Sequence, residues 1–92
     1  MSVEVRVPTV LRKHTGGERI VQLSGETISG LIESLETQFP GMKGELIGDD
    51  GQLRQFVNIY LNDEDIRYLG RLEAKIVDGD RVAILPAVAG GC

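Results

Sequence analysis

The sequence predicts an α+β domain in which a mixed sheet is covered by one main helix. Three observations favour this class. Near the start of the chain Val3, Val5 and Val7 alternate with polar residues, which is typical of a half-buried strand. Residues 28–39 carry one apolar stripe with the spacing of an amphipathic helix. Residues 56–61 are again strand-like, so a sheet is the only large surface on which the helix can bury its stripe.

Length and composition indicate one small globular domain. The chain has 92 residues, of which 41% are apolar and 26% charged. The formal net charge is −4 and the basic residues are scattered along the sequence, so we expect no nucleic-acid partner. No apolar run approaches the length of a membrane span, and no signal-peptide pattern is visible. With a single cysteine there is no internal disulfide, and we expect a cytoplasmic protein that does not contact a membrane.

The first part of the chain is expected to form a hairpin. Residues 2–8 form a strand that ends at a proline, because proline cannot donate a hydrogen bond to a ladder. Residues 9–17 form a loop, and residues 18–23 form a second strand, antiparallel to the first. The direction in which this second strand faces stays open, because Ile20 and Val21 are both apolar.

The main helix follows a turn over residues 24–26. Thr27 is a suitable N-cap, and Pro40-Gly41 ends the helix. Its apolar stripe consists of Ile28, Leu31, Ile32, Leu35 and Phe39. The glycine-rich residues 41–52 come next, and we expect a short turn of helix there.

The second part of the chain supplies the remaining strands. Asn62 to Asp65 are expected to form a turn, because Asn and Asp side chains satisfy local backbone groups. The other expected elements are a strand over 56–61, a short return strand over 66–68, a helical turn or loop around Leu72 and Ile76, a turn over 78–80 and a last strand over 81–85. The acidic residues of this half suit solvated turns, and a partner with a basic patch is the alternative.

The resulting order is β-β-α-β-β-β, which is the β-grasp arrangement also seen in ubiquitin. We expect residues 1–86 to form this domain and residues 87–92 to form a flexible diglycine tail. The pattern alone does not fix the order of the strands in the sheet.

An ordinary active site is hard to assemble from these residues. The only histidine, His14, lies in a polar loop and is expected at the surface. One histidine and one cysteine at opposite ends of the chain lack the spacing of metal ligands. Asp63, Glu64 and Asp65 suggest paired carboxylates, but the turn explains them more simply. We therefore expect neither a bound metal nor enzymatic activity.

The tail has two interpretations of its own. Gly90-Gly91 is either a frayed end, as chain ends commonly are, or a chemical handle. Glycines can thread a narrow tunnel because they lack Cβ atoms. The carboxylate of a terminal glycine is also the least hindered acyl group that a chain can present to an activating enzyme.

Four segments carry a resemblance to a known family. They read VEVRVPTVLRKHTGG, FVNIYLNDEDIRYLGRL, DGDRVAILP and VAILPAVAGG. Together they resemble the ubiquitin-like sulfur carriers of the MoaD/ThiS family, and within it the CysO-like branch that serves an alternative route to cysteine. The resemblance covers nearly the whole chain. It implies that the first and last strands lie side by side at the centre of the sheet.

The resemblance also implies chemistry in which the tail is a substrate. A ThiF/MoeB-like activating enzyme adenylates the carboxyl group of Gly91 with ATP, and a sulfur donor then leaves a thiocarboxylate. Gly90 is the slender neighbour inside the enzyme's channel. Ala87, Val88 and Ala89 lie along the partner surface, although their apolar character also suits packing on the domain itself. The chain binds no cofactor, because the partner enzyme uses the ATP.

Cys92 departs from the family pattern, which ends in Gly-Gly, and three interpretations stay open. In the first, Cys92 is a precursor extension that a JAMM-type zinc metalloprotease removes. In the second, Gly91-Cys92 mimics a product. A thiocarboxylate adds to an aminoacrylate on a pyridoxal-phosphate cysteine-synthase-like enzyme, an S-to-N acyl shift follows, and the same kind of protease releases cysteine. In the third, Cys92 is a reactive thiol.

Three rival functions remain beside the sulfur carrier of cysteine or another thio-metabolite. The chain is also consistent with the small subunit of a molybdopterin synthase, with a ubiquitin-like protein modifier, and with a binding module whose tail is inert. The sequence identifies neither the sulfur donor nor the final acceptor.

Overall fold

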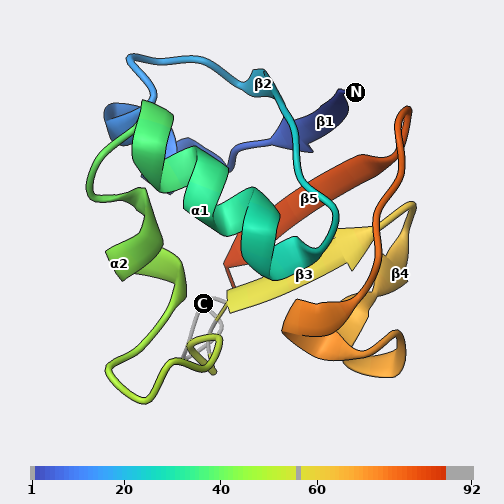
Figure 1. Ribbon diagram of the computed structural model, residues 1–92. Coiled ribbons are helices and arrows are strands. Elements are labelled where there is room, and N and C mark those ends of the chain that lie inside the picture. Colours follow the sequence, from blue (N-terminus) through green and yellow to red (C-terminus); the bar gives the residue numbers. More distant parts are fainter. Residues whose placement is uncertain (1, 56, 87–92) are drawn as a thin grey trace.

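A five-stranded mixed sheet forms one layer of the molecule, and helix α1 crosses one of its faces (Figure 1). This is a computed structural model, and it describes residues 2–55 and 57–86. The strands are β1 (Val3–Arg6), β2 (Ile20–Leu23), β3 (Val57–Leu61), β4 (Glu64–Asp65) and β5 (Arg81–Pro86). The helices are α1 (Ile28–Gln38), α2 (Met42–Leu46) and the short 3-10 helices η1 (Thr9–His14), η2 (Ile66–Tyr68) and η3 (Arg71–Glu73).

The two ends of the described chain meet at the centre of the sheet. The strand order is β2-β1-β5-β3-β4. Strand β1 pairs in parallel with β5, with Val5 opposite Val82, and antiparallel with β2, with Val5 opposite Val21. On its other side β5 pairs antiparallel with β3, with Ile84 opposite Ile59. The β-grasp fold and the central position of the first and last strands are thereby confirmed.

One face of the sheet packs on α1 and is buried. Strand β2 turns Val21 and Leu23 toward this core and leaves Ile20 42% exposed, which settles the facing that the sequence left open. Strand β3 buries alternate residues, as its period of two predicts. The most deeply buried large side chains are Ile28, Leu31, Leu35, Met42, Leu46, Ile59 and Ile66. Four of the five residues of the predicted α1 stripe are buried, and Phe39 packs against the core from just beyond the helix end.

Two expectations about local structure are wrong. The return strand is β4, Glu64–Asp65, and residues 66–68 form η2 instead. Asn62 and Asp63 have φ values of 51° and 72°, as a two-residue type I′ hairpin turn requires, so pairing resumes directly after them. The predicted loop 9–17 contains η1, which buries Leu11.

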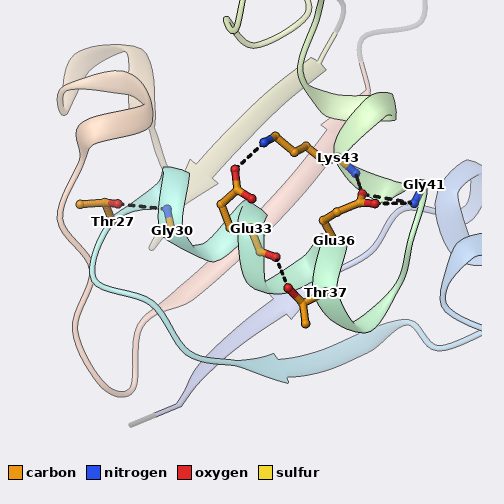
Figure 2. Close-up of polar contacts among 7 residues, drawn as sticks. All are labelled: Thr27, Gly30, Glu33, Glu36, Thr37, Gly41 and Lys43. Carbon is orange, nitrogen blue, oxygen red and sulfur yellow. Dashed lines mark hydrogen bonds and ion pairs between the residues drawn. The ribbon is translucent and has the colours of Figure 1, made fainter.

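A side chain at each end of α1 accepts hydrogen bonds from backbone N–H groups at the start of a helix, either α1 itself or α2 (Figure 2). The hydroxyl of Thr27 accepts a hydrogen bond of 3.1 Å from the N–H of Gly30, which confirms the predicted N-cap. At the other end the Glu36 carboxylate accepts hydrogen bonds from the N–H groups of Gly41 and Lys43, at distances down to 2.8 Å. Glu36 therefore anchors the first turn of α2 to α1.

We expect Thr27→Ala to lower the free energy of unfolding by about 1 kcal/mol, because it removes an N-cap. Thr37→Ala is a matched control, since the Thr37 hydroxyl only donates to the carbonyl of Glu33 inside α1, and exposed changes of this kind stay within about 0.5 kcal/mol. Urea denaturation measures both variants. Equal losses in the two would show that the cap contributes nothing.

We expect Glu36→Gln to destabilise the domain at neutral pH and much less in acid. The N–H groups of Lys43 and Gly41 hold the pKa of Glu36 below its ordinary value of 4.5. The stabilisation is therefore present above that value and is lost as the pH falls through the lower, folded-state pKa. Urea denaturation at several pH values between 7 and 3 compares the variant with the parent chain, and Glu64→Gln on exposed β4 is the control. A difference in the free energy of unfolding between variant and parent that does not change with pH would contradict this role of Glu36.

Candidate functional site

The residues that the sequence singled out lie just past the last described strand. Ala87, Val88, Ala89, Gly90, Gly91 and Cys92 fall outside the described residues. The structure does describe how the segment before them is held, because β5 runs to Pro86. The candidate site therefore consists of the end of β5 and the surfaces around it.

The end of β5 is held mainly by β3. Pairing with β1 extends as far as Ala83, which lies opposite Arg6. Pairing with β3 continues to Pro86, which lies opposite Val57. Because the two strands are antiparallel, the end of β5 lies beside the start of β3 (Figure 1). Leu85 precedes a proline, which favours the extended backbone that β5 keeps up to Pro86.

On the second face of the sheet, opposite α1, the described side chains of the strands are half-buried or exposed, and we call it the open face. Leu85 lies on this open face and is 48% exposed, close to the exit of the chain. Alternation along the strands places the following residues on it as well: Glu4, Arg6, Ile20, Gln22, Asn58, Tyr60, Arg81 and Ala83. The open face combines apolar side chains with arginines, a combination that suits contact with another protein.

Arginines that are scattered along the sequence gather in space around this face. Arg6, Arg12 and Arg19 line a shallow depression of about 240 Å³ together with Ile20. Arg6 also lines a neighbouring depression of about 150 Å³ with Arg81. Sequence reasoning missed this cluster, because no spacing along the chain indicates it. The strand register is the signal that could have found it, since it places Arg6 between β2 and β5.

A cluster of three polar side chains links β3, β4 and η2. The guanidinium of Arg67 donates to Oδ2 of Asp65 at 2.8 Å and to Oδ1 of Asn58 at 2.7 Å. The side chain of Arg67 and then its backbone N–H hold the pKa of Asp65 below its ordinary value. Asp65 is thus a structural cap of η2 and a partner of Arg67, and it does not form a carboxylate pair with Asp63 or Glu64.

Other acidic residues also serve turns, as the sequence analysis expected. The carboxylates of Asp50, Asp78 and Asp80 accept hydrogen bonds from the backbone N–H groups of Gln52, Ser2 and Val77. Asp50 and Asp80 thus bind backbone within their own turns, whereas Asp78 binds the backbone near the start of the chain.

His14 is less exposed than the sequence suggested. Its side chain is 20% exposed, and its Nε2 lies 3.4 Å from a carboxylate oxygen of Glu45. Its imidazole also lies against Gly41. His14, the last residue of η1, therefore packs against α2.

Two kinds of feature are absent from the described residues. No helix among them is both long and apolar enough to cross a bilayer. Within the same ranges, 2–55 and 57–86, no three side chains of His, Cys, Asp or Glu come together as metal ligands would.

Comparisons with known proteins agree on one family. The model of the ThiS family matches residues 5–91. The sulfur carrier protein CysO of Mycobacterium tuberculosis strain H37Rv is 50% identical over 93 residues, with 99% of this chain and all of the relative covered. The small archaeal modifier protein 3 of Haloferax volcanii is 31% identical, again over 99% of this chain and all of the relative.

The structural comparison gives the same result. In the crystal structure of the Amycolatopsis orientalis BexX/CysO complex, one chain matches with a TM-score of 0.91 and 48% identity, covering 97% of this chain and 99% of that chain. Small carriers of this kind are substrates of other proteins and are not themselves enzymes. The chain therefore belongs to the ThiS family of ubiquitin-like proteins, and within it is a CysO-like sulfur carrier protein.

Proposed function

We propose that this carrier works through Gly91, which bears a thiocarboxylate and donates its sulfur in the biosynthesis of cysteine or another thio-metabolite. One observation supports this most directly. The family model matches the chain as far as Gly91 and leaves Cys92 outside the match. The name of the M. tuberculosis relative, a sulfur carrier 50% identical over its full length, supports the same chemistry.

The proposed reaction begins at a free Gly91 carboxylate. An activating enzyme of the ThiF/MoeB type joins this carboxylate to AMP and releases pyrophosphate from ATP. A sulfur donor then attacks the acyl carbon, the bond to AMP breaks, and a thiocarboxylate remains. These reaction steps need a slim chain segment that can enter a closed active site. Gly90 and the small residues before it are suitable for this. Because ATP is consumed, we place the pathway in the cytoplasm.

Cys92 must leave before activation, because the Gly91 carbonyl is otherwise part of an amide. We propose that a JAMM-type zinc metalloprotease hydrolyses the Gly91–Cys92 bond. The same hydrolysis would release a cysteine built on the carrier by a pyridoxal-phosphate cysteine-synthase-like enzyme. In that step the sulfur adds to the β-carbon of an enzyme-bound aminoacrylate, and the acyl group then moves from sulfur to nitrogen.

The open face offers these partner enzymes a surface beside the tail. Its exposed Leu85 is one residue before Pro86, and its arginines give it positive charge within a chain of net charge −4. In the BexX/CysO crystal structure a carrier 48% identical to this chain forms a complex with another protein. We infer that Ala87, Val88 and Ala89 continue this contact toward the active site of the partner.

A second candidate function is protein modification. The relative named small archaeal modifier protein 3 is 31% identical over nearly the whole chain. A modifier would share the adenylation of Gly91 but would pass the acyl group to a lysine of another protein. Species of higher mass that carry this chain through an isopeptide bond would favour this function.

We expect the chain isolated from its own cells to end at Gly91. Its intact mass should be lower by one cysteine residue, and a fraction that grows under sulfur demand should show one oxygen exchanged for sulfur. Mass spectrometry of the intact protein makes this measurement. If every molecule keeps Cys92 under sulfur limitation, the proposed activation does not occur, and a binding module with an inert tail becomes the better explanation.

We expect Gly90→Ala, in a chain that ends at Gly91, to lower kcat/KM for adenylation by about 10- to 100-fold, because small displacements of a reacting group have effects of this size. Release of pyrophosphate from ATP with the activating enzyme measures the rate. Gly44→Ala is the matched control, since a Cβ atom at Gly44 would meet no atom within 4 Å. Equal adenylation rates for Gly90→Ala and the control would show that position 90 does not require glycine.

A further inference from the structure

A cavity of about 220 Å³ lies beside the point where β5 ends. Its wall includes Val57, which is opposite Pro86 in the ladder between β3 and β5. Paired Cα atoms in an antiparallel ladder are about 4.5–5.5 Å apart, so the cavity begins one strand away from the last described residue. We call it the arginine pocket, because Arg54, Arg67 and Arg71 line it.

Two of these arginines, Arg54 and Arg71, form no ion pair with an acidic side chain of the described residues. Arg67 is paired with Asp65, at 2.8 Å. Arg54 is held in place by a hydrogen bond of 3.0 Å from its Nε to the carbonyl oxygen of Gly44, which uses neither of its terminal nitrogens. In the described part of the chain, neither Arg54 nor Arg71 forms an ion pair. The pocket therefore suits an anion.

The backbone of Arg71 is in an unfavourable conformation. Its φ is 58°, and it follows Gly70 with a φ of 109°. A residue with a Cβ atom keeps a left-handed φ only where the surrounding structure imposes it, and such residues cluster at binding and catalytic sites. Here this conformation begins η3 and sets Arg71 in the wall of the pocket.

The remaining wall is partly apolar. Leu53 and Leu72 line the pocket and are only half-buried, although they pack against the core. A ligand that satisfies both parts of the wall carries a carboxylate-like anion at the end of a slim apolar segment.

We propose that the arginine pocket binds the carboxyl-terminal segment of this chain, residues 87–91, with its terminal carboxylate or thiocarboxylate beside Arg54 and Arg71. The inference deepens the proposed function and rests on it, because the anion in question is the one at Gly91. The segment has the required character, since Ala87, Val88 and Ala89 are small and apolar and two glycines follow.

Position and length both favour this occupant. Strand β5 ends beside the start of β3 (Figure 1), and residues 52–55, which precede β3 in the chain, line the pocket. Five residues in extended form span at most about 17 Å. This length exceeds the separation of about 5 Å between Pro86 and Val57, which lies in the wall of the pocket.

Such binding would shield the sulfur between activation and transfer. A thiocarboxylate is a strong nucleophile, and an anion held between two guanidinium groups reacts more slowly with electrophiles in solution. Ion pairs near a surface are weak, so a partner enzyme that contacts the open face can draw the segment away. The pocket would then hold the thiocarboxylate end of the loaded carrier until a partner enzyme binds.

The test uses a chain that ends at a Gly91 thiocarboxylate made by chemical thiolysis, and measures its alkylation by iodoacetamide. In this reaction a carbon–sulfur bond forms and iodide leaves. We expect Arg54→Ala/Arg71→Ala to accelerate alkylation by about 2- to 10-fold, as two weak ion pairs allow. The difference should shrink in 1 M salt, where the Debye length is about 3 Å.

The matched control is Lys13→Ala/Lys75→Ala, which removes the same charge from two exposed side chains outside the pocket and should leave the alkylation rate at the parent value. Amide NMR spectra provide a second measurement, in which signals of residues 87–91 should shift in the pocket variant and not in the control. Unfolding temperatures confirm that both variants fold, and Arg54→Gln/Arg71→Gln replaces the pocket variant if it does not.

Equal alkylation rates in the parent chain and the pocket variant, with unshifted tail signals, would overturn the inference. It would also be overturned if the pocket variant lost only transfer of sulfur to a partner, because the pocket would then bind the partner. Since the thiocarboxylate is made chemically, these outcomes are independent of the proposed function. That function fails separately if the activating enzyme and ATP cannot load Gly91.

Discussion

The parallel pairing of β1 with β5 is the constraint on which the rest of the structure depends. It brings residues near the start of the chain against the last described strand, with Val5 opposite Val82. A parallel pair requires a long crossover connection, and the chain between the two strands supplies it with α1 on one face of the sheet (Figure 1). Once β5 is central, β3 must flank it and β4 must form the edge. The pairing of β5 with β3 then holds the end of the strand at Pro86.

Sequence patterns predicted the elements in which burial has a regular period. The alternation in β1 and β3 and the stripe of α1 were correct because one side of each element is buried. The return strand was misplaced because Asn62-Asp63 lacks the usual glycine, although both residues adopt a left-handed φ. Helix η1 was missed because a single buried residue, Leu11, has no period. The central position of the first and last strands was predicted only from the resemblance to the family, since no local sequence pattern determines the order of strands in a sheet.

The proposed site is visible in the sequence in one part and hidden in the other. The diglycine, to which we assign the proposed chemistry, is visible because it consists of two adjacent residues. The arginine pocket is not visible in the sequence, because Arg54, Arg67 and Arg71 come from three separate loops and short helices. Their meeting depends on the turn at Asn62-Asp63 and on the backbone of Arg71. Local patterns thus indicate the reacting group, whereas tertiary structure determines what surrounds it.

The central position of β5 also has a mechanical consequence. A partner that draws the tail into a narrow channel pulls on β5 along its own axis. That force is shared at once by the hydrogen bonds to β1 and to β3, which are loaded in shear. An edge strand such as the two-residue β4 has only one neighbour with which to share such a force. The sheet is therefore built as an anchor that resists traction on the tail while the domain stays folded outside the channel.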